Sequence, residues 1–271
     1  MKLAAIGDHL IHVPVRVGGL EETRFVFDTG VGLDLVSNAL LARAGGRLTG
    51  ETHTGRRMSG QLLEVPLARV PSLSLGSLRQ ENALVGVFDL AFPPELQRIE
   101  GFLAPTFFGK TLFTLRRRAG TLAWGGDDPS EILDARGQGV PLEVRWDGPT
   151  VTLFVDLELP DGSIATVEVD TGSSNLILDA RFMASFGVRE GDPGVRKHEG
   201  TDETGYSYVR YLAPIRGRLS VRGLSGIAQS DPVVMFQKII YDGLLGDEFL
   251  RSYDVTFDLH RSRIYFAPTR D

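Results

Sequence analysis

"FVFDTG" at residues 25–30 and "VEVDTG" at residues 167–172 decide how this chain of 271 residues is interpreted. In each stretch, strand-forming residues lead into Asp-Thr-Gly, which is typical of a strand that ends in a tight turn. One such triplet is most often only a turn. Two copies in matching surroundings predict instead that Asp28 and Asp170 occupy equivalent places in a repeated unit.

The repeat extends well beyond the triplets. Asp28 and Asp170 are 142 positions apart, and this offset aligns further features of the sequence. Both triplets are preceded by an alternating pattern with a Gly-containing turn, which predicts a hairpin. Both are followed by a short helix with a polar N-cap and a terminating glycine. The aligned pairs are Ser37 with Asp179, Gly45 with Gly187, residues 101–108 with 243–250, and Thr114 with Thr256.

These patterns predict an all-β fold with short helices and a pseudo-twofold internal repeat. We expect an N-terminal lobe over residues 1–139 and a C-terminal lobe over residues 140–271. The stretch 125–149 is rich in Gly, Pro and Asp, belongs to neither repeat and is interpreted as the joint.

Composition excludes several classes of protein. The chain has no cysteine, which excludes thiol catalysis and disulfides, and its net charge of -6 argues against a nucleic-acid partner. The run Arg116–Arg118 is expected to be a solvated strand end rather than a phosphate site. The five histidines are scattered, so neither a metal site nor a cofactor is expected.

The chain is expected to have no membrane partner, because no apolar run approaches the roughly 20 residues that a spanning helix needs. No signal peptide is recognised at the N-terminus. A cytoplasmic location is the default expectation, and a secreted or periplasmic one follows if a leader has been removed.

A strand followed by Asp-Thr-Gly, with an apolar-apolar-Gly motif well downstream, resembles the aspartic proteases. Two such halves in one chain resemble the two-lobed, pepsin-like members, whereas the short lobes and the stretch "GLLGDEFLRSYDVTFDL" are more similar to retropepsins. The resemblance covers nearly the whole chain apart from the joint. It implies an aspartic endopeptidase that acts as a monomer on a peptide or protein substrate.

The chemistry supports this resemblance. Two carboxyl groups held close together share one proton, because both cannot ionise cheaply. The ionised aspartate then takes a proton from water, and the protonated one donates to the carbonyl under attack. We therefore predict Asp28 and Asp170 as the catalytic pair.

The residues around each aspartate are predicted to support it. Glycine allows close approach of the backbone, and the resemblance implies that the two threonines hydrogen-bond to the opposite loop. These supporting residues are Thr29, Gly30, Thr171, Gly172 and Ser173. The resemblance also implies that Leu244, Leu245 and Gly246 pass beneath the second loop.

The first half departs from the family pattern in two places. Ala104 replaces the glycine of the apolar-apolar-Gly motif, and Val31 stands where pepsin-like enzymes usually have Ser or Thr. These two departures, together with the absence of a tyrosine from the hairpin at residues 52–65, favour an alternative to the enzyme. The alternative is a non-catalytic module that binds a peptide or polymer on the same fold.

Two Gly-containing hairpins, at residues 52–65 and 198–211, are candidates for flaps over a cleft. The flap residues proposed from the sequence are Met58, Ser59, Gly60, Tyr206 and Tyr208. Ordinary exposed hairpins are an equal alternative.

Overall fold

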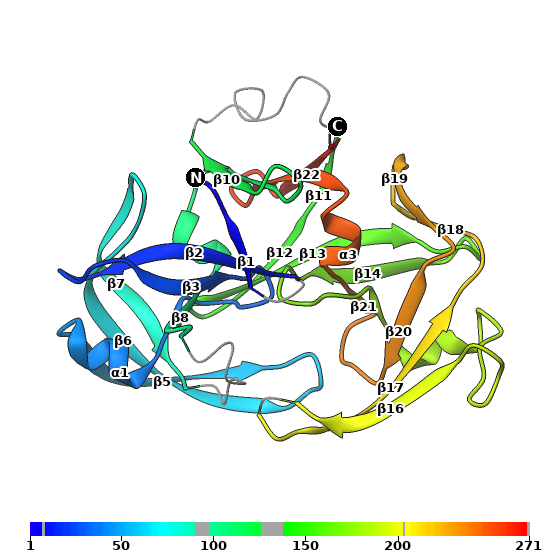
Figure 1. The fold of residues 1–271 in the computed structure, drawn as a ribbon, viewed down its shortest axis with the longest axis horizontal. Coiled ribbons are helices and arrows are strands. Elements are labelled where there is room, and N and C mark those ends of the chain that lie inside the picture. The colour runs from blue at the N-terminus through cyan, green and yellow to red at the C-terminus, as the bar shows by residue number, and fades with distance from the viewer. Residues whose placement is uncertain (7–8, 90–97, 126–137, 203, 270–271) are drawn as a thin grey trace.

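The computed structural model describes residues 1–6, 9–89, 98–125, 138–202 and 204–269. In these residues the chain is built mostly from strands, which form three sheets (Figure 1). The predicted all-β class with short helices is therefore confirmed. No helix in this part of the chain is both long and apolar enough to cross a membrane. The helices are α1 (Asn38–Arg43), α3 (Asp247–Leu250) and the 3₁₀ helices η2 (Pro105–Phe108) and η3 (Ala180–Met183).

The first sheet has eight strands from the N-terminal part of the chain. Its central strands carry alternating apolar residues, and the inward-facing ones, such as Ile11, Val13 and Val15, are fully buried. In spatial order the strands are β1 (Ala4–Ile6), β2 (Leu10–Val17), β3 (Thr23–Phe27), β8 (Gly101–Leu103), β4 (Leu35–Val36), β7 (Leu78–Val87), β6 (Leu62–Leu75) and β5 (Arg47–Arg56).

The second sheet has ten strands from the C-terminal part of the chain and lies opposite the first in Figure 1. Its main path is β16 (Arg196–Thr201), β17 (Ser207–Pro214), β20 (Val233–Gln237), β15 (Ile177–Asp179), β21 (Gly243–Leu245), β14 (Ile164–Val169), β13 (Thr150–Glu158), β18 (Arg218–Val221) and β19 (Leu224–Ser230). One further strand, β12 (Glu143–Asp147), pairs with β13 off this path.

The third sheet joins the two parts of the chain. Its order is β10 (Thr121–Trp124), β9 (Phe113–Arg116), β22 (Tyr253–Asp258), β23 (Arg263–Pro268) and β11 (Gln138–Pro141). Thr114 and Thr256, which the sequence offset aligns, lie directly opposite each other with their hydroxyl oxygens 2.6 Å apart. The predicted lobe boundary between residues 139 and 140 falls within β11 and stays a prediction. Residues 126–137 of the predicted joint lie outside the described residues.

Each aspartate-bearing strand has equivalent neighbours. Strand β3 pairs in parallel with β8, which is antiparallel to β4, and β14 pairs in parallel with β21, which is antiparallel to β15. The predicted helix caps are present, because the Ser37 side chain accepts from the Leu40 N–H and the Asp179 side chain from the Arg181 N–H. The second helix is a 3₁₀ turn rather than an α-helix.

The arginine run does not lie wholly in solvent. Arg117 donates from Nε and Nη2 to the two carboxylate oxygens of Asp247, at 2.5 and 3.0 Å, and from Nη2 to the His9 carbonyl at 2.8 Å. Its side chain is 11% exposed and that of Asp247 only 1%. The expectation of a solvated strand end is therefore wrong for Arg117. A bidentate guanidinium–carboxylate pair in a buried setting ties the β9–β10 turn to the start of α3.

Candidate active site

The two aspartates occupy matching positions at the ends of their strands. Asp28 follows β3 and donates its backbone N–H to the Leu103 carbonyl of β8, at 3.0 Å. Asp170 follows β14 and donates its N–H to the Leu245 carbonyl of β21, at 3.1 Å. Because each parallel partner strand holds the backbone at the last residue before the turn, the direction of each carboxyl group is set by the sheet.

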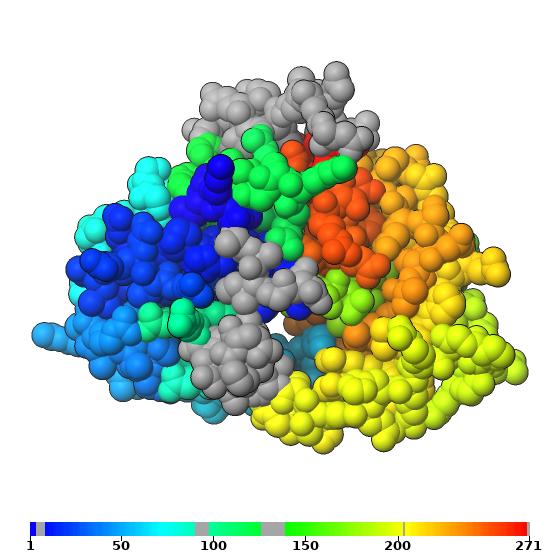
Figure 2. Space-filling view, viewed as in Figure 1, coloured from blue at the N-terminus to red at the C-terminus, as the bar shows by residue number. Residues whose placement is uncertain are grey.

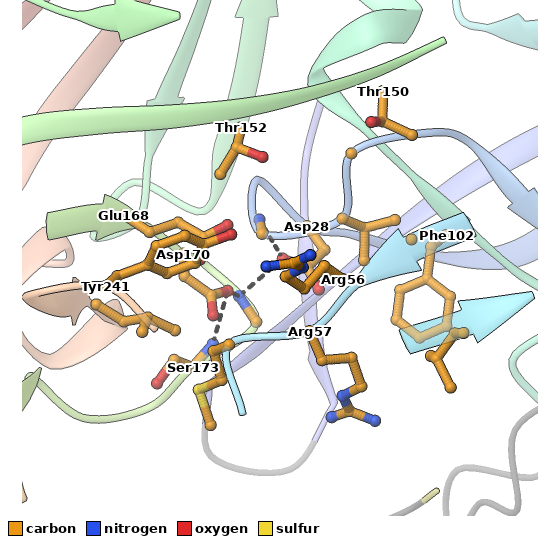
Figure 3. Close-up of a pocket in the computed structure, with 18 of the residues that line it drawn as sticks. Asp28, Arg56, Arg57, Phe102, Thr150, Thr152, Glu168, Asp170, Ser173 and Tyr241 are labelled. Carbon is orange, nitrogen blue, oxygen red and sulfur yellow. Dashed lines mark hydrogen bonds between the residues drawn. The ribbon is translucent and has the colours of Figure 1, made fainter. Parts of the chain in front are cut away.

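The carboxyl groups of Asp28 and Asp170 meet over the two glycines (Figure 3). The Gly172 N–H donates both to Asp170 Oδ1, at 2.8 Å, and to Asp28 Oδ1, at 3.1 Å. The Gly30 N–H donates to Asp28 Oδ1 at 2.8 Å. A Cβ atom at Gly172 would lie 2.3 Å from Asp28 Oδ2, and one at Gly30 would lie 2.5 Å from Asp170 Oδ1. Only glycine lets the two loops approach this closely.

The two threonines of the triplets link the loops beneath the carboxyl groups. The Thr29 N–H donates to Thr171 Oγ1, and the Thr171 N–H donates to Thr29 Oγ1, both at 3.0 Å. The Thr29 hydroxyl in turn donates to the Val169 carbonyl at 2.6 Å. Both threonines are fully buried, so these hydrogen bonds satisfy polar groups that water cannot reach.

The segments beneath the two loops differ in a way that explains the sequence. A Cβ atom at Gly246 would lie 2.3 Å from the Asn175 carbonyl oxygen, so this position requires glycine. At the matching position of the first half, Ala104 is accommodated with no exposure, and its N–H donates to Asp34 Oδ1 at 2.8 Å. The departure at Ala104 therefore leaves the support of Asp28 in place.

The other departure, Val31, has a similarly small consequence. Ser173, its counterpart in the second half, donates its backbone N–H to Asp170 Oδ1 at 3.1 Å. Its hydroxyl donates to the Asn175 carbonyl, at 3.2 Å, rather than to the aspartate. The Ser173 hydroxyl therefore supports its own loop and not the aspartate. Val31 lacks this hydroxyl, but no hydrogen bond to a carboxyl group is lost as a result.

Burial and proximity change the acid–base properties of the pair. Burial raises the pKa of Asp28 well above its usual range, and the Asp170 carboxylate raises it further, against the N–H groups of Gly30 and Gly172. Burial also raises the pKa of Asp170, although hydrogen bonds from Gly172, Asp28 and Ser173 favour its ionised form. Each carboxyl group therefore influences the protonation of the other. Such a pair holds one shared proton over a wide pH range.

The aspartate pair opens into a cavity of about 1040 Å³ between the two large sheets. Figure 2 shows the surface hollowed between the two parts of the chain. Figure 3 shows Arg56, Arg57 and Phe102 on the Asp28 side of the cavity and Glu168, Ser173 and Tyr241 on the Asp170 side. The volume is in the range of cavities that bind a ligand of several residues or a drug-sized molecule.

The tips of the two candidate flaps meet at the edge of this cavity. The Met58 carbonyl accepts from the Ile240 N–H at 2.9 Å, and the Thr204 hydroxyl donates to Gln61 Oε1 at 2.9 Å. Arg57 pairs with Asp202 at 3.5 Å. The first hairpin thus reaches across to the C-terminal part of the chain.

The predicted flap residues are not equally placed. Met58 lines the cavity, and Ser59 and Gly60 form the turn at the tip of the first hairpin. Tyr206 and Tyr208 are not among the residues that line the cavity. Tyr206 is 41% exposed, and the Tyr208 ring packs against Arg210. Their assignment as flap residues stays a prediction.

Several cavity residues were not predicted from the sequence. Glu168 and Tyr241 lie beside Asp170, and the His9 ring lies 3.0 Å from the Gly172 carbonyl oxygen. The alternation in "VEVDTG" already placed Glu168 on the same side of the strand as Asp170. No comparable signal marked Tyr241 or His9. Among the described residues there is no group of three or more metal-ligating side chains.

Comparison with known proteins agrees with this geometry for the first part of the chain. The model of the aspartyl protease family matches residues 13–104, which include Asp28, Thr29 and the strand below them. A search of curated proteins found no match. The family match and the mostly β fold support the aspartic protease superfamily for this chain.

Proposed function

We propose that this chain is an aspartic endopeptidase whose single chain supplies both catalytic carboxyl groups, Asp28 and Asp170. The observation that carries the proposal is the Gly172 N–H shared between the two carboxyl groups at the base of a large cavity. The match to the aspartyl protease family supports a protease-type function. A peptide or protein is the proposed substrate, and a monomer is sufficient.

The proposed reaction needs only the proton that the pair shares. The ionised aspartate takes a proton from a water held between the two groups, and this water attacks the peptide carbonyl. The protonated aspartate donates a hydrogen bond to the carbonyl oxygen and stabilises the tetrahedral intermediate. The aspartate that took the proton from water then gives it to the leaving amine, the C–N bond breaks, and the other aspartate regains its proton from a hydroxyl of the intermediate.

Matching contacts support an internal duplication as the origin of the two lobes. The parallel and antiparallel neighbours of β3 and β14 are equivalent, and Thr114 and Thr256 contact each other at the 142-residue offset. On this interpretation the chain combines a pepsin-like two-lobed plan with short retropepsin-like lobes. The hairpins 52–65 and 198–211 are proposed to act as two flaps.

The test is cleavage of a diverse peptide library by Asp28→Asn and Asp170→Asn. We expect each substitution to lower kcat/KM by about 10³-fold or more, since general acid–base catalysis alone contributes roughly 10²–10⁴-fold. Thermal unfolding should occur at the same or a higher temperature, because each substitution removes a buried group that resists ionisation. Asp161→Asn, at an exposed turn, is the matched control.

The outcome also separates the enzyme from the alternative binding module. Cleavage that a statine-type transition-state mimic blocks supports the enzyme. Equal cleavage by wild type and both aspartate variants would overturn the assignment of the pair. Tight binding of the mimic without any cleavage by the wild type would favour the binding module.

A further inference from the structure

Glu168 is a buried carboxyl group that the proposed reaction does not use. Its residue is only 6% exposed, yet it lines the cavity. In the part of the chain that the structure describes, its carboxyl group makes no hydrogen bond and no ion pair. Its oxygens are not among the described buried polar atoms that lack a partner, so they face the space of the cavity, where a polar group of a ligand can reach them.

Glu168 lies next to the aspartate pair. It stands two residues before Asp170 on β14, so both side chains project from the same side of the strand. Burial raises the pKa of Glu168 well above its usual range, and the charges of Asp170 and Asp28 raise it further. Glu168 therefore lies in the same cavity as the aspartate pair, on the Asp170 side.

The equivalent position in the first half is different. The 142-residue offset aligns Val26 with Glu168. Val26 is fully buried and does not line the cavity. Beside Asp28, the side chains of Leu33, Leu35 and Val65 cluster around Gly86 and face the cavity. The Asp28 side of the cavity thus combines an apolar cluster with Arg56 and Arg57, whereas the Asp170 side contains a further carboxyl group, that of Glu168.

The cations around Glu168 do not neutralise it. Arg145 is engaged by Glu143 through two hydrogen bonds, at 2.7 and 3.1 Å, and lies over the Phe154 ring. Arg145 and Arg56 act on Tyr241 instead, whose pKa is raised to about 12 by burial and by Glu168. Neither arginine is among the groups that influence the pKa of Glu168.

The geometry points to a specificity subsite. We propose that Glu168 selects substrates with a lysine or arginine side chain directly beside the scissile bond, on the Asp170 side of the cleft. The proposal rests on the endopeptidase function proposed above. Tyr241 and Thr152, which lie in the same part of the cavity in Figure 3, form the walls of this subsite.

The physical reason is the pairing of an otherwise uncompensated group. With no ligand bound, burial and two neighbouring carboxyl groups favour the uncharged form of Glu168. An ammonium or guanidinium group brought in by the substrate favours the ionised form and forms a charge-assisted hydrogen bond to it. An apolar side chain of the same length leaves the carboxyl group unpaired. A hydrogen bond to a charged group of this kind corresponds to a preference of about 10- to 100-fold.

The test uses two series of peptides that differ at one residue, either lysine or norleucine, placed on each side of the cut. Wild-type chain is expected to cleave one lysine peptide about 10- to 100-fold better, by kcat/KM, than its norleucine partner. Glu168→Gln should reduce this ratio to about one, and Glu168→Val, which copies the residue at position 26, should favour norleucine. Glu158→Gln removes an exposed acidic residue of the same lobe and should keep the wild-type ratio.

Failure of the subsite and failure of the enzyme give different results. If both peptides are cleaved and Glu168→Gln keeps the wild-type ratio, the subsite is overturned while the endopeptidase stands. If wild type cleaves neither peptide, the endopeptidase is overturned, and calorimetric binding of the same two peptides decides the subsite. Tighter binding of the lysine peptide to wild type but not to Glu168→Gln supports it, and equal binding to both proteins overturns it.

Discussion

Asp34 provides a test of the structure that does not depend on the substrate. This aspartate is 2% exposed, and its Oδ1 accepts the N–H of Ala104, the residue that replaces glycine beneath the Asp28 loop. Burial raises its pKa from 3.8 to about 7, and the hydrogen bond from Ala104 only partly opposes the change. The folded chain therefore binds a proton that the unfolded chain releases at much lower pH.

The sign of the effect on stability follows directly. Between the unfolded and folded pKa values the folded state binds more protons, so stability falls as pH rises through this range. A shift from 3.8 to about 7 corresponds to about 4 kcal/mol in full, of which about 2.5 kcal/mol is lost between pH 5 and pH 8. Asp34→Asn keeps the acceptor for Ala104 but cannot ionise, so the variant escapes this loss.

The assay is urea unfolding of wild type and Asp34→Asn at pH 5 and pH 8. The free energy of unfolding of the variant, relative to wild type, should increase by about 2.5 kcal/mol between the two pH values. Asp28, Asp170 and Glu168 are present in both proteins, so their contributions cancel in this difference. Parallel pH dependence of the two proteins would show that Asp34 is not buried as an unpaired carboxyl group and would refute the reasoning.

Three further predictions concern the site and its cover. Gly172→Ala should reduce kcat/KM by about 100-fold or more, because its Cβ would lie 2.3 Å from Asp28 Oδ2, whereas Gly19→Ala, with nothing within 4 Å, should cleave normally. Thr171→Val should lower the free energy of unfolding by about 2–4 kcal/mol in urea titrations, since buried backbone groups lose their partners. Asp202→Asn should raise KM about 3- to 10-fold and remove the dependence of KM on salt, because the ion pair with Arg57 across the flap tips is lost. An unchanged KM would contradict a role for this pair in closing the flaps.

Signals in the sequence were sufficient to predict the features that depend on neighbouring residues. The two Asp-Thr-Gly turns, the N-caps Ser37 and Asp179 and the strands on either side of them each depend on a few neighbouring residues. Hydrogen bonds over two or three positions and the alternation of apolar residues are sufficient to specify such features. The fixed offset between the two halves then indicated that the aspartates are equivalent.

Packing of the folded chain sets which side chains face the cavity and which form contacts between the two halves. Glu168 and Val26 occupy equivalent strand positions, yet one lines the cavity and the other is buried away from it. Arg117, which belongs to a run of three arginines, pairs with Asp247. Tyr241 lines the cavity, whereas Tyr206 and Tyr208 of the hairpin at residues 198–211 do not. These outcomes depend on contacts between residues more than a hundred positions apart, because burial is a property of the packed molecule and not of the strand that carries the side chain.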